Sequence, residues 1–173
     1  GVGDARALLP DLIARLAVET PQFVMESQSV VRELATSSHV AALVAALRGA
    51  EQRQARSTIL EILLDVAEAD APADHGLDAL LLELARSGPS EIRHSVLRAL
   101  VERAAHRREL LAGLLSIYED SDHNQRTQVL SAWSAAASEI RLPIEFLGRH
   151  LKDRYQFWAL SRLVLREGRA AEP

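Results

Sequence analysis

The sequence contains no cysteine. This excludes disulfides, thiolate nucleophiles and zinc sites with thiolate ligands, and it agrees with a reducing compartment such as the cytoplasm. Aromatic residues make up only 4% of the chain, and glycine and proline number 8 and 6, which disfavours a β-sandwich built on tight turns. Long apolar runs are also missing, so we expect neither a membrane span nor a secretory signal peptide.

Positive charge is in short supply as well. The net charge is −4, with 24 acidic and 20 basic residues, whereas a non-specific nucleic-acid binder usually carries the opposite sign. Acidic residues outnumber basic ones in residues 1–86, and the reverse holds in residues 87–173. The composition therefore makes nucleic acid a poor candidate partner. A length of 173 residues is typical of a single domain.

What the chain has in abundance is apolar residues at helical spacing. Leu77, Leu80, Leu81 and Leu84 follow steps of three and four, which place them on one helix face. The same pattern predicts helices over 4–18, 21–36, 38–48, 51–69, 75–87, 89–105, 107–119, 122–139, 142–152 and 154–167. We expect Ser38, Asp74 and Asp122 to cap helix starts, and Ser87-Gly88-Pro89-Ser90 to end one helix and begin the next. Loops of two to five residues make neighbouring helices antiparallel.

The helix pairs repeat. A shift of 33 residues superposes residues 75–105 on 107–139, and a shift of 37 superposes 38–69 on 75–105. Matched apolar positions are Val40, Leu43 and Leu47 with Leu77, Leu80 and Leu84; Leu77, Leu81 and Leu84 with Leu110, Leu114 and Ile117; and Ile59 and Leu63 with Val96 and Leu100, and with Val129 and Trp133. The first and last pairs match less closely, as expected of end repeats that cap a core. Trp133 occupies a leucine position and is expected in the core.

The matched segments resemble HEAT repeats. The nearest match is the stretch from Ser90 to Leu100, which carries an early arginine, and Leu8-Leu9-Pro10-Asp11-Leu12 resembles a proline-bearing first helix. The resemblance implies an all-α, right-handed α-solenoid of about five antiparallel helix pairs in a single domain, 1–173. The pairs are approximately 4–36, 38–69, 75–105, 107–139 and 142–167. An armadillo array, with three helices per repeat, is the alternative, but two helices per 33–37 residues argue against it.

One arginine recurs at the same place in three repeats, as Arg56, Arg93 and Arg126. An arginine ladder of this kind could bind phosphate or carboxylate groups. We favour a structural role, because arginines here in the resembled family hydrogen-bond loop carbonyls or acids of the adjoining repeat.

The same resemblance implies that the second helix of each pair lines a concave face. Positions one, five and nine residues after the repeated arginine define a stripe, which we call the second-helix stripe. Its members by pair are Met25, Ser29 and Glu33; Ser57, Glu61 and Asp65; His94, Arg98 and Glu102; Thr127, Ser131 and Ala135; and Trp158, Arg162 and Arg166. The partner-binding residues that we predict from it are Glu61, Asp65, His94, Arg98, Glu102, Trp158, Arg162 and Arg166.

No catalytic, metal-binding or cofactor motif appears. The six histidines form no His-x-x-x-His pair beside a carboxylate, and there is no phosphate loop or nucleophile elbow. The sequence thus favours a non-catalytic module or scaffold that binds a protein or peptide, without cofactor or metal, and leaves its oligomeric state open. Two alternatives remain: an enzyme resembling the HEAT-like alkylpurine DNA glycosylases, and a subunit resembling HEAT-type bilin lyases.

Overall fold

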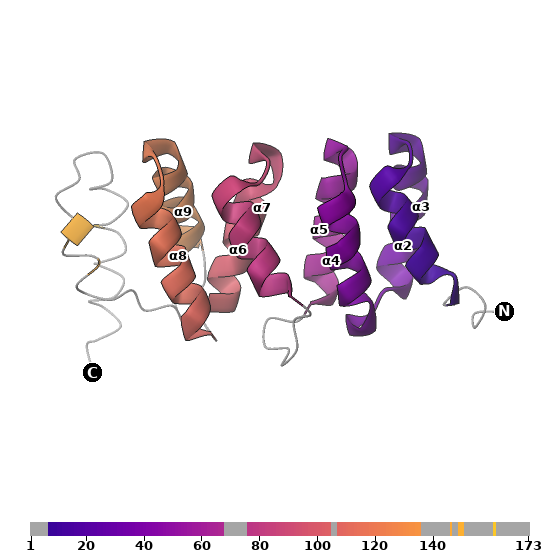
Figure 1. The fold of residues 1–173 in the computed structure, drawn as a ribbon, viewed down its shortest axis with the longest axis horizontal. Helices are drawn as coiled ribbons and strands as arrows, with labels where there is room; N and C mark the ends of the chain where they lie inside the picture. The colour runs from indigo at the N-terminus through magenta and orange to yellow at the C-terminus, as the bar shows by residue number, and fades with distance from the viewer. Residues whose placement is uncertain are drawn as a thin grey trace. The chain divides into compact units, whose positions relative to one another are not determined.

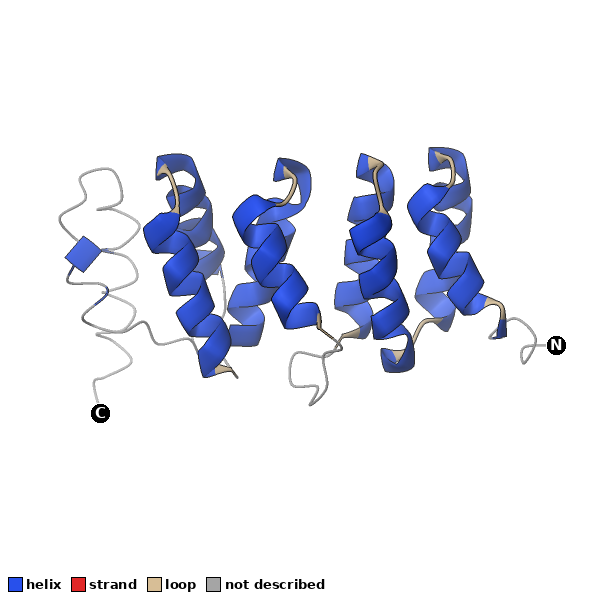
Figure 2. Cartoon of the chain, in the orientation of Figure 1, coloured by secondary structure: helices blue, strands red, loops and turns tan. Residues whose placement is uncertain are grey.

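A computed structural model of the chain describes residues 7–67, 76–104 and 107–135, together with Phe146, Arg149, His150 and Ser161. Over these residues every regular element is helical (Figure 2), which confirms the predicted all-α class. The elements are α2 (Leu9–Val18), α3 (Pro21–Leu34), the 3-10 helix η1 (Ser37–His39), α4 (Val40–Gly49), α5 (Arg53–Val66), α6 (Leu77–Ser87), α7 (Ser90–Ala104), α8 (Arg108–Asp120) and α9 (His123–Ala135). No helix in this part of the chain is long and apolar enough to cross a membrane.

The chain divides into two compact units, which are described separately. Unit 1 comprises residues 1–80 and 89–92, and unit 2 comprises residues 81–88 and 93–173. In unit 1, α2 packs against α3 and α4, and α5 packs against the same two helices (Figure 1). Its core holds aliphatic side chains from all four, including Ile13, Leu16, Val24, Val31, Leu43, Leu47, Ile59 and Leu63.

In unit 2, α8 packs against α9 and closely approaches α6. A methyl group added at Gly113 of α8 would lie 2.7 Å from Cδ2 of Leu82 in α6, so glycine permits this approach. The apolar positions matched by the 33- and 37-residue shifts are buried in both units, except Leu84, which is half-buried. The repeat spacing therefore identified core positions, because each matched residue lies at the same point in its helix pair.

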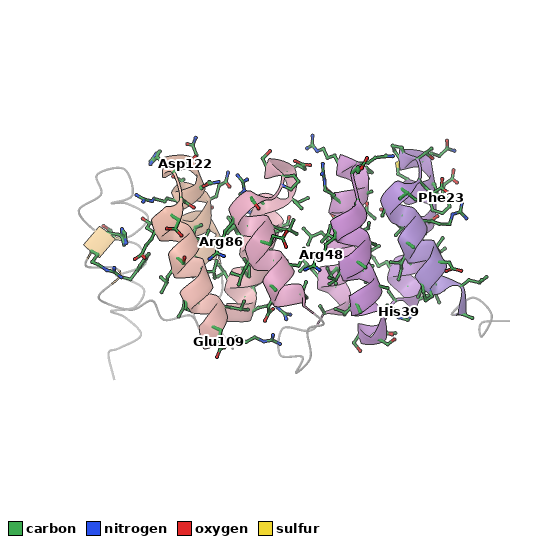
Figure 3. The ribbon with its side chains drawn as sticks, in the orientation of Figure 1. Phe23, His39, Arg48, Arg86, Glu109 and Asp122 are labelled. Carbon is green, nitrogen blue, oxygen red and sulfur yellow. The ribbon has the colours of Figure 1, made fainter. Side chains whose placement is uncertain are left out.

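Helix ends follow local chemistry that the sequence partly predicted. Asp122 Oδ1 accepts a hydrogen bond from the Gln125 amide at 2.9 Å, which confirms Asp122 as a cap at the start of α9 (Figure 3). Ser38 was wrongly expected to cap a helix at 38–48. It lies inside η1 instead, where Thr36 and His39 form a capping box, and α4 begins after His39 without a side-chain cap. The third predicted cap, Asp74, lies outside the described residues.

Glycine and proline punctuate the chain as expected, with one correction. Helix α6 ends at Ser87 and α7 begins at Ser90, so the predicted break at Gly88-Pro89 is confirmed. A side chain at Gly88 would overlap the carbonyl oxygen of Leu84, which restricts this position to glycine. The predicted helix over 4–18 does not run unbroken, because Leu8 is a turn residue and α2 begins at Leu9. Pro10 lies in the first turn of α2, where its missing amide hydrogen costs nothing.

Candidate interaction face

The three repeated arginines direct their side chains into the protein. In unit 2, Arg93 Nη2 donates to the carbonyl oxygen of Gly88 at 2.7 Å. Arg126 donates from Nε to the carbonyl of Tyr118 at 3.1 Å and from Nη2 to that of Glu119 at 2.9 Å. Both arginines therefore donate to carbonyl groups at or just beyond the C-terminal end of the preceding helix, where backbone donors are scarce.

Arg56 makes a different contact in unit 1. Its Nη2 lies 2.9 Å from Glu91 Oε1, and the two side chains are only 25% and 17% exposed. Partial burial strengthens such a pair relative to one in open solvent. A group bound from outside would have to compete with Glu91 for this guanidinium.

The second-helix stripe is exposed on each helix where the structure describes it. Met25, Ser29 and Glu33 are exposed on α3, and Glu61 and Asp65 are exposed on α5, where Ser57 is half-buried. The exposed members in unit 2 are His94, Arg98 and Glu102 on α7, and Thr127, Ser131 and Ala135 on α9. Trp158, Arg162 and Arg166, the predicted basic end of the stripe, lie outside the described residues.

Several charges of the stripe are paired within the chain. Arg32 of α3 places Nη2 3.1 Å from Glu61 Oε2 and Nε 3.1 Å from Asp65 Oδ2. On α7, Arg98 Nε lies 2.9 Å from Glu102 Oε1, one turn further along the helix. These pairs are largely exposed, so each contributes only about 0.2–1 kcal/mol to stability. They nevertheless offset much of the charge that the sequence suggested.

The role of Arg32 was missed at the level of sequence. It sits next to Glu33 on α3, whereas its partners are on α5, and only the relative register of these two helices brings them together. The first pair is where the repeat matches least closely, so its register was the least certain. The four-residue spacing of Glu61 and Asp65 was the one available signal, because it puts both carboxylates on one helix face.

A second unpredicted feature is a cluster of aromatic rings in unit 2. Tyr118, Trp133 and Phe146 are fully or almost fully buried, and the expected core position of Trp133 is confirmed. The Phe146 ring centroid lies 5.1 Å from that of Tyr118 and 5.9 Å from that of Trp133, both edge-to-face. The ring centroid of His150 lies 4.7 Å from that of Phe146, with the two rings tilted, and 5.0 Å from that of Tyr118, edge-to-face. This cluster packs the interior and does not extend the exposed stripe.

The described side chains bear on two questions, whether a metal ion could be held and what contacts the stripe can make. Within the described ranges, no three or more histidine, aspartate or glutamate residues are grouped so that they could hold a metal ion. The exposed stripe offers hydroxyl, carboxylate, guanidinium and imidazole groups, with the thioether of Met25. Such groups can hydrogen-bond and pack against a partner. The chain matches no family model, no curated protein and no solved structure.

Proposed function

We propose that this chain is a HEAT-like α-solenoid of about five helix pairs that binds another protein through its second-helix stripe. The solenoid arrangement is supported by burial of the matched apolar positions at 33- and 37-residue spacings. It is also supported by the antiparallel pairing expected from the short turns between α2 and α3, α4 and α5, and α8 and α9, each pair being in contact.

One observation carries the binding proposal. Stripe residues other than the half-buried Ser57 are exposed on α3, α5, α7 and α9, although they were selected only by their register in the sequence repeat. The arginines themselves are engaged with Glu91 and with helix-end carbonyls, which favours the exposed stripe residues over the arginines as contacts for a partner. Solenoid proteins use such surfaces for extended protein ligands.

Small exposed residues allow a sharp test. Ser29→Arg on α3 and Ser131→Arg on α9 add a long charged side chain to the stripe without removing a core contact. Ala14→Arg on α2 and Ala112→Arg on α8 make a similar addition at exposed positions of first helices. Circular dichroism is the control that checks whether all four variants keep the helical fold.

The readout is affinity capture from a lysate followed by quantitative mass spectrometry. We expect one stoichiometric protein to be recovered with the wild type, with Ala14→Arg and with Ala112→Arg. The same protein should be lost with Ser29→Arg, with Ser131→Arg or with both. Loss through Ala14→Arg or Ala112→Arg alone would place the contact on the first helices and refute the stripe.

The enzyme alternative makes the opposite prediction about nucleic acid. A protein resembling an alkylpurine DNA glycosylase should retard duplex DNA at moderate salt and lose that binding steeply as salt rises. We expect no retardation. The paired charges of Arg32 with Glu61 and Asp65 leave no excess of positive charge on that part of the face.

A further inference from the structure

The short helix η1, which connects α3 to α4 within unit 1, is built around a histidine (Figure 3). The Thr36 amide donates a hydrogen bond to His39 Nδ1 at 3.2 Å. The hydroxyl oxygens of Thr36 and Ser38 lie 3.1 and 3.3 Å from the same nitrogen, and 2.8 Å from each other. The arrangement is a capping box in which His39 takes the position usually held by glutamate or glutamine.

The chemistry of these donors fixes the state of the ring. A backbone amide can only donate, so Nδ1 must keep its lone pair, and the imidazole must be neutral with its hydrogen on Nε2. Histidine is also the side chain that ordinarily changes charge between about pH 5 and 8, which neither glutamine nor an ordinary glutamate does.

We propose that this turn is a pH-sensitive joint between the first and second helix pairs. Protonation of His39 places a hydrogen on Nδ1, directly facing the Thr36 amide. The two hydroxyl groups can rotate and accept from the new hydrogen, but the amide cannot change from donor to acceptor. The capping bond is therefore present while the ring is neutral, and it is lost as the pH falls and the ring gains its proton.

The charged groups on the neighbouring elements do not replace that bond. Helix α4, against which η1 packs, has Arg48 as its one charged residue, in its last turn and so at the far end from η1. Helix α3 carries Arg32 and Glu33 shortly before the turn, and Arg32 is engaged with carboxylates of α5. Arginine side chains only donate, so neither Arg48 nor Arg32 can accept a hydrogen bond from the Thr36 amide in place of Nδ1. Glu33 is the one acceptor among these groups, and it is exposed on α3.

The consequence is local loosening at one connection. Thr36 and Ser38 are exposed and His39 is half-buried, so water can solvate the freed amide and the fold need not unfold. The change is the loss of one hydrogen bond that holds the backbone between α3 and α4. The inference does not depend on the proposed binding function, because it rests on the hydrogen bonds of the turn alone.

Hydrogen exchange at the Thr36 amide tests the joint directly. One hydrogen bond has a net value near 1 kcal/mol, so we expect the protection factor of this amide to fall roughly fivefold between pH 7.5 and pH 5.0 in the wild type. His39→Gln keeps a side-chain acceptor that does not titrate, and its protection factor should stay constant. His94→Gln, at an exposed position on α7, controls for the loss of any histidine. In this variant the protection factor of the Thr36 amide should depend on pH as it does in the wild type.

Two results would overturn the proposal. One is a parallel change of Thr36 protection in the wild type and His39→Gln. The other is a hydrogen on Nδ1 of His39 at pH 7.5, seen in the nitrogen chemical shifts of the ring, because it contradicts the capping geometry. This second measurement uses the wild type, so it applies even if His39→Gln disturbs the turn. A bare Nδ1 together with a pH-dependent loss confined to proteins that retain His39 supports it.

Discussion

Replacing Arg126 by methionine tests whether the repeated arginines hold helix pairs together. The substitution keeps an apolar stem and removes the donors to the carbonyls of Tyr118 and Glu119. It also removes a guanidinium whose carbon lies 5.5 Å from the centre of the Tyr118 ring. The Tyr118 carbonyl retains a bond from the Ser121 amide at 3.3 Å, and Glu119 is exposed, so water can replace part of what is lost.

These contacts set the expected magnitude. A hydrogen bond from a charged donor has a net value of about 1.5–3 kcal/mol, and the residual solvation reduces the sum of two such bonds to about 2 kcal/mol. The ring contact adds about 0.5 kcal/mol. Arg98→Met is the matched control in the same unit, because it removes an exposed pair with Glu102 and should cost about 0.3–0.5 kcal/mol.

Unfolding in guanidinium chloride, followed by circular dichroism, measures the difference in stability between the two variants. With a denaturant dependence of about 3 kcal/mol per molar, Arg126→Met should lower the midpoint by about 0.8 M, and Arg98→Met by only about 0.1–0.2 M. Equal midpoints in the two variants would refute the structural role of Arg126 and reopen the possibility that the repeated arginines bind an external anion.

Two further substitutions probe the packing of unit 2. Gly88→Ala should destabilise by at least about 1 kcal/mol, since the new methyl group overlaps the Leu84 carbonyl, whereas Gly49→Ala meets nothing within 4 Å and should be neutral or slightly stabilising in thermal unfolding. A smaller effect at Gly88 than at Gly49 would contradict the overlap. Phe146→Ala should cost about 3–5 kcal/mol and shift the Trp133 fluorescence to longer wavelength, because the two rings are in contact and both are buried. Unchanged emission would argue against that contact.

Apolar positions that recur in the sequence predicted much of the buried interior. Val40, Leu77 and Leu110 are related by the 37- and 33-residue shifts, and all three are buried. Asp122 was equally accessible, since its capping bond reaches only three residues along the chain. Interactions of this kind depend on local spacing, which a single sequence displays directly.

Contacts between elements were harder to foresee. Arg32 meets Glu61 and Asp65 only because α3 and α5 pack in one particular register. Ser38 was predicted as a helix cap, but the structure has Thr36 as the N-cap of η1 and Ser38 inside that 3-10 turn. Thr36 and Ser38 are two residues apart and both carry a hydroxyl group, so propensity does not distinguish them and the backbone geometry does.

The pairing of charges along the stripe changes what kind of partner the proposed face suits. The sequence suggested a gradient from acidic to basic, which would favour a strongly charged ligand. In unit 1, one guanidinium lies between two carboxylates; on α7, Arg98 and Glu102 offset each other; and the stripe members of α9 are uncharged. A ligand that relied on charge would have to break these pairs and would gain little from each. On α7 and α9 the described stripe therefore favours recognition by shape and by hydrogen bonds to serine, threonine and histidine side chains. On α3 and α5 it keeps three carboxylates, Glu33, Glu61 and Asp65, against the one guanidinium of Arg32.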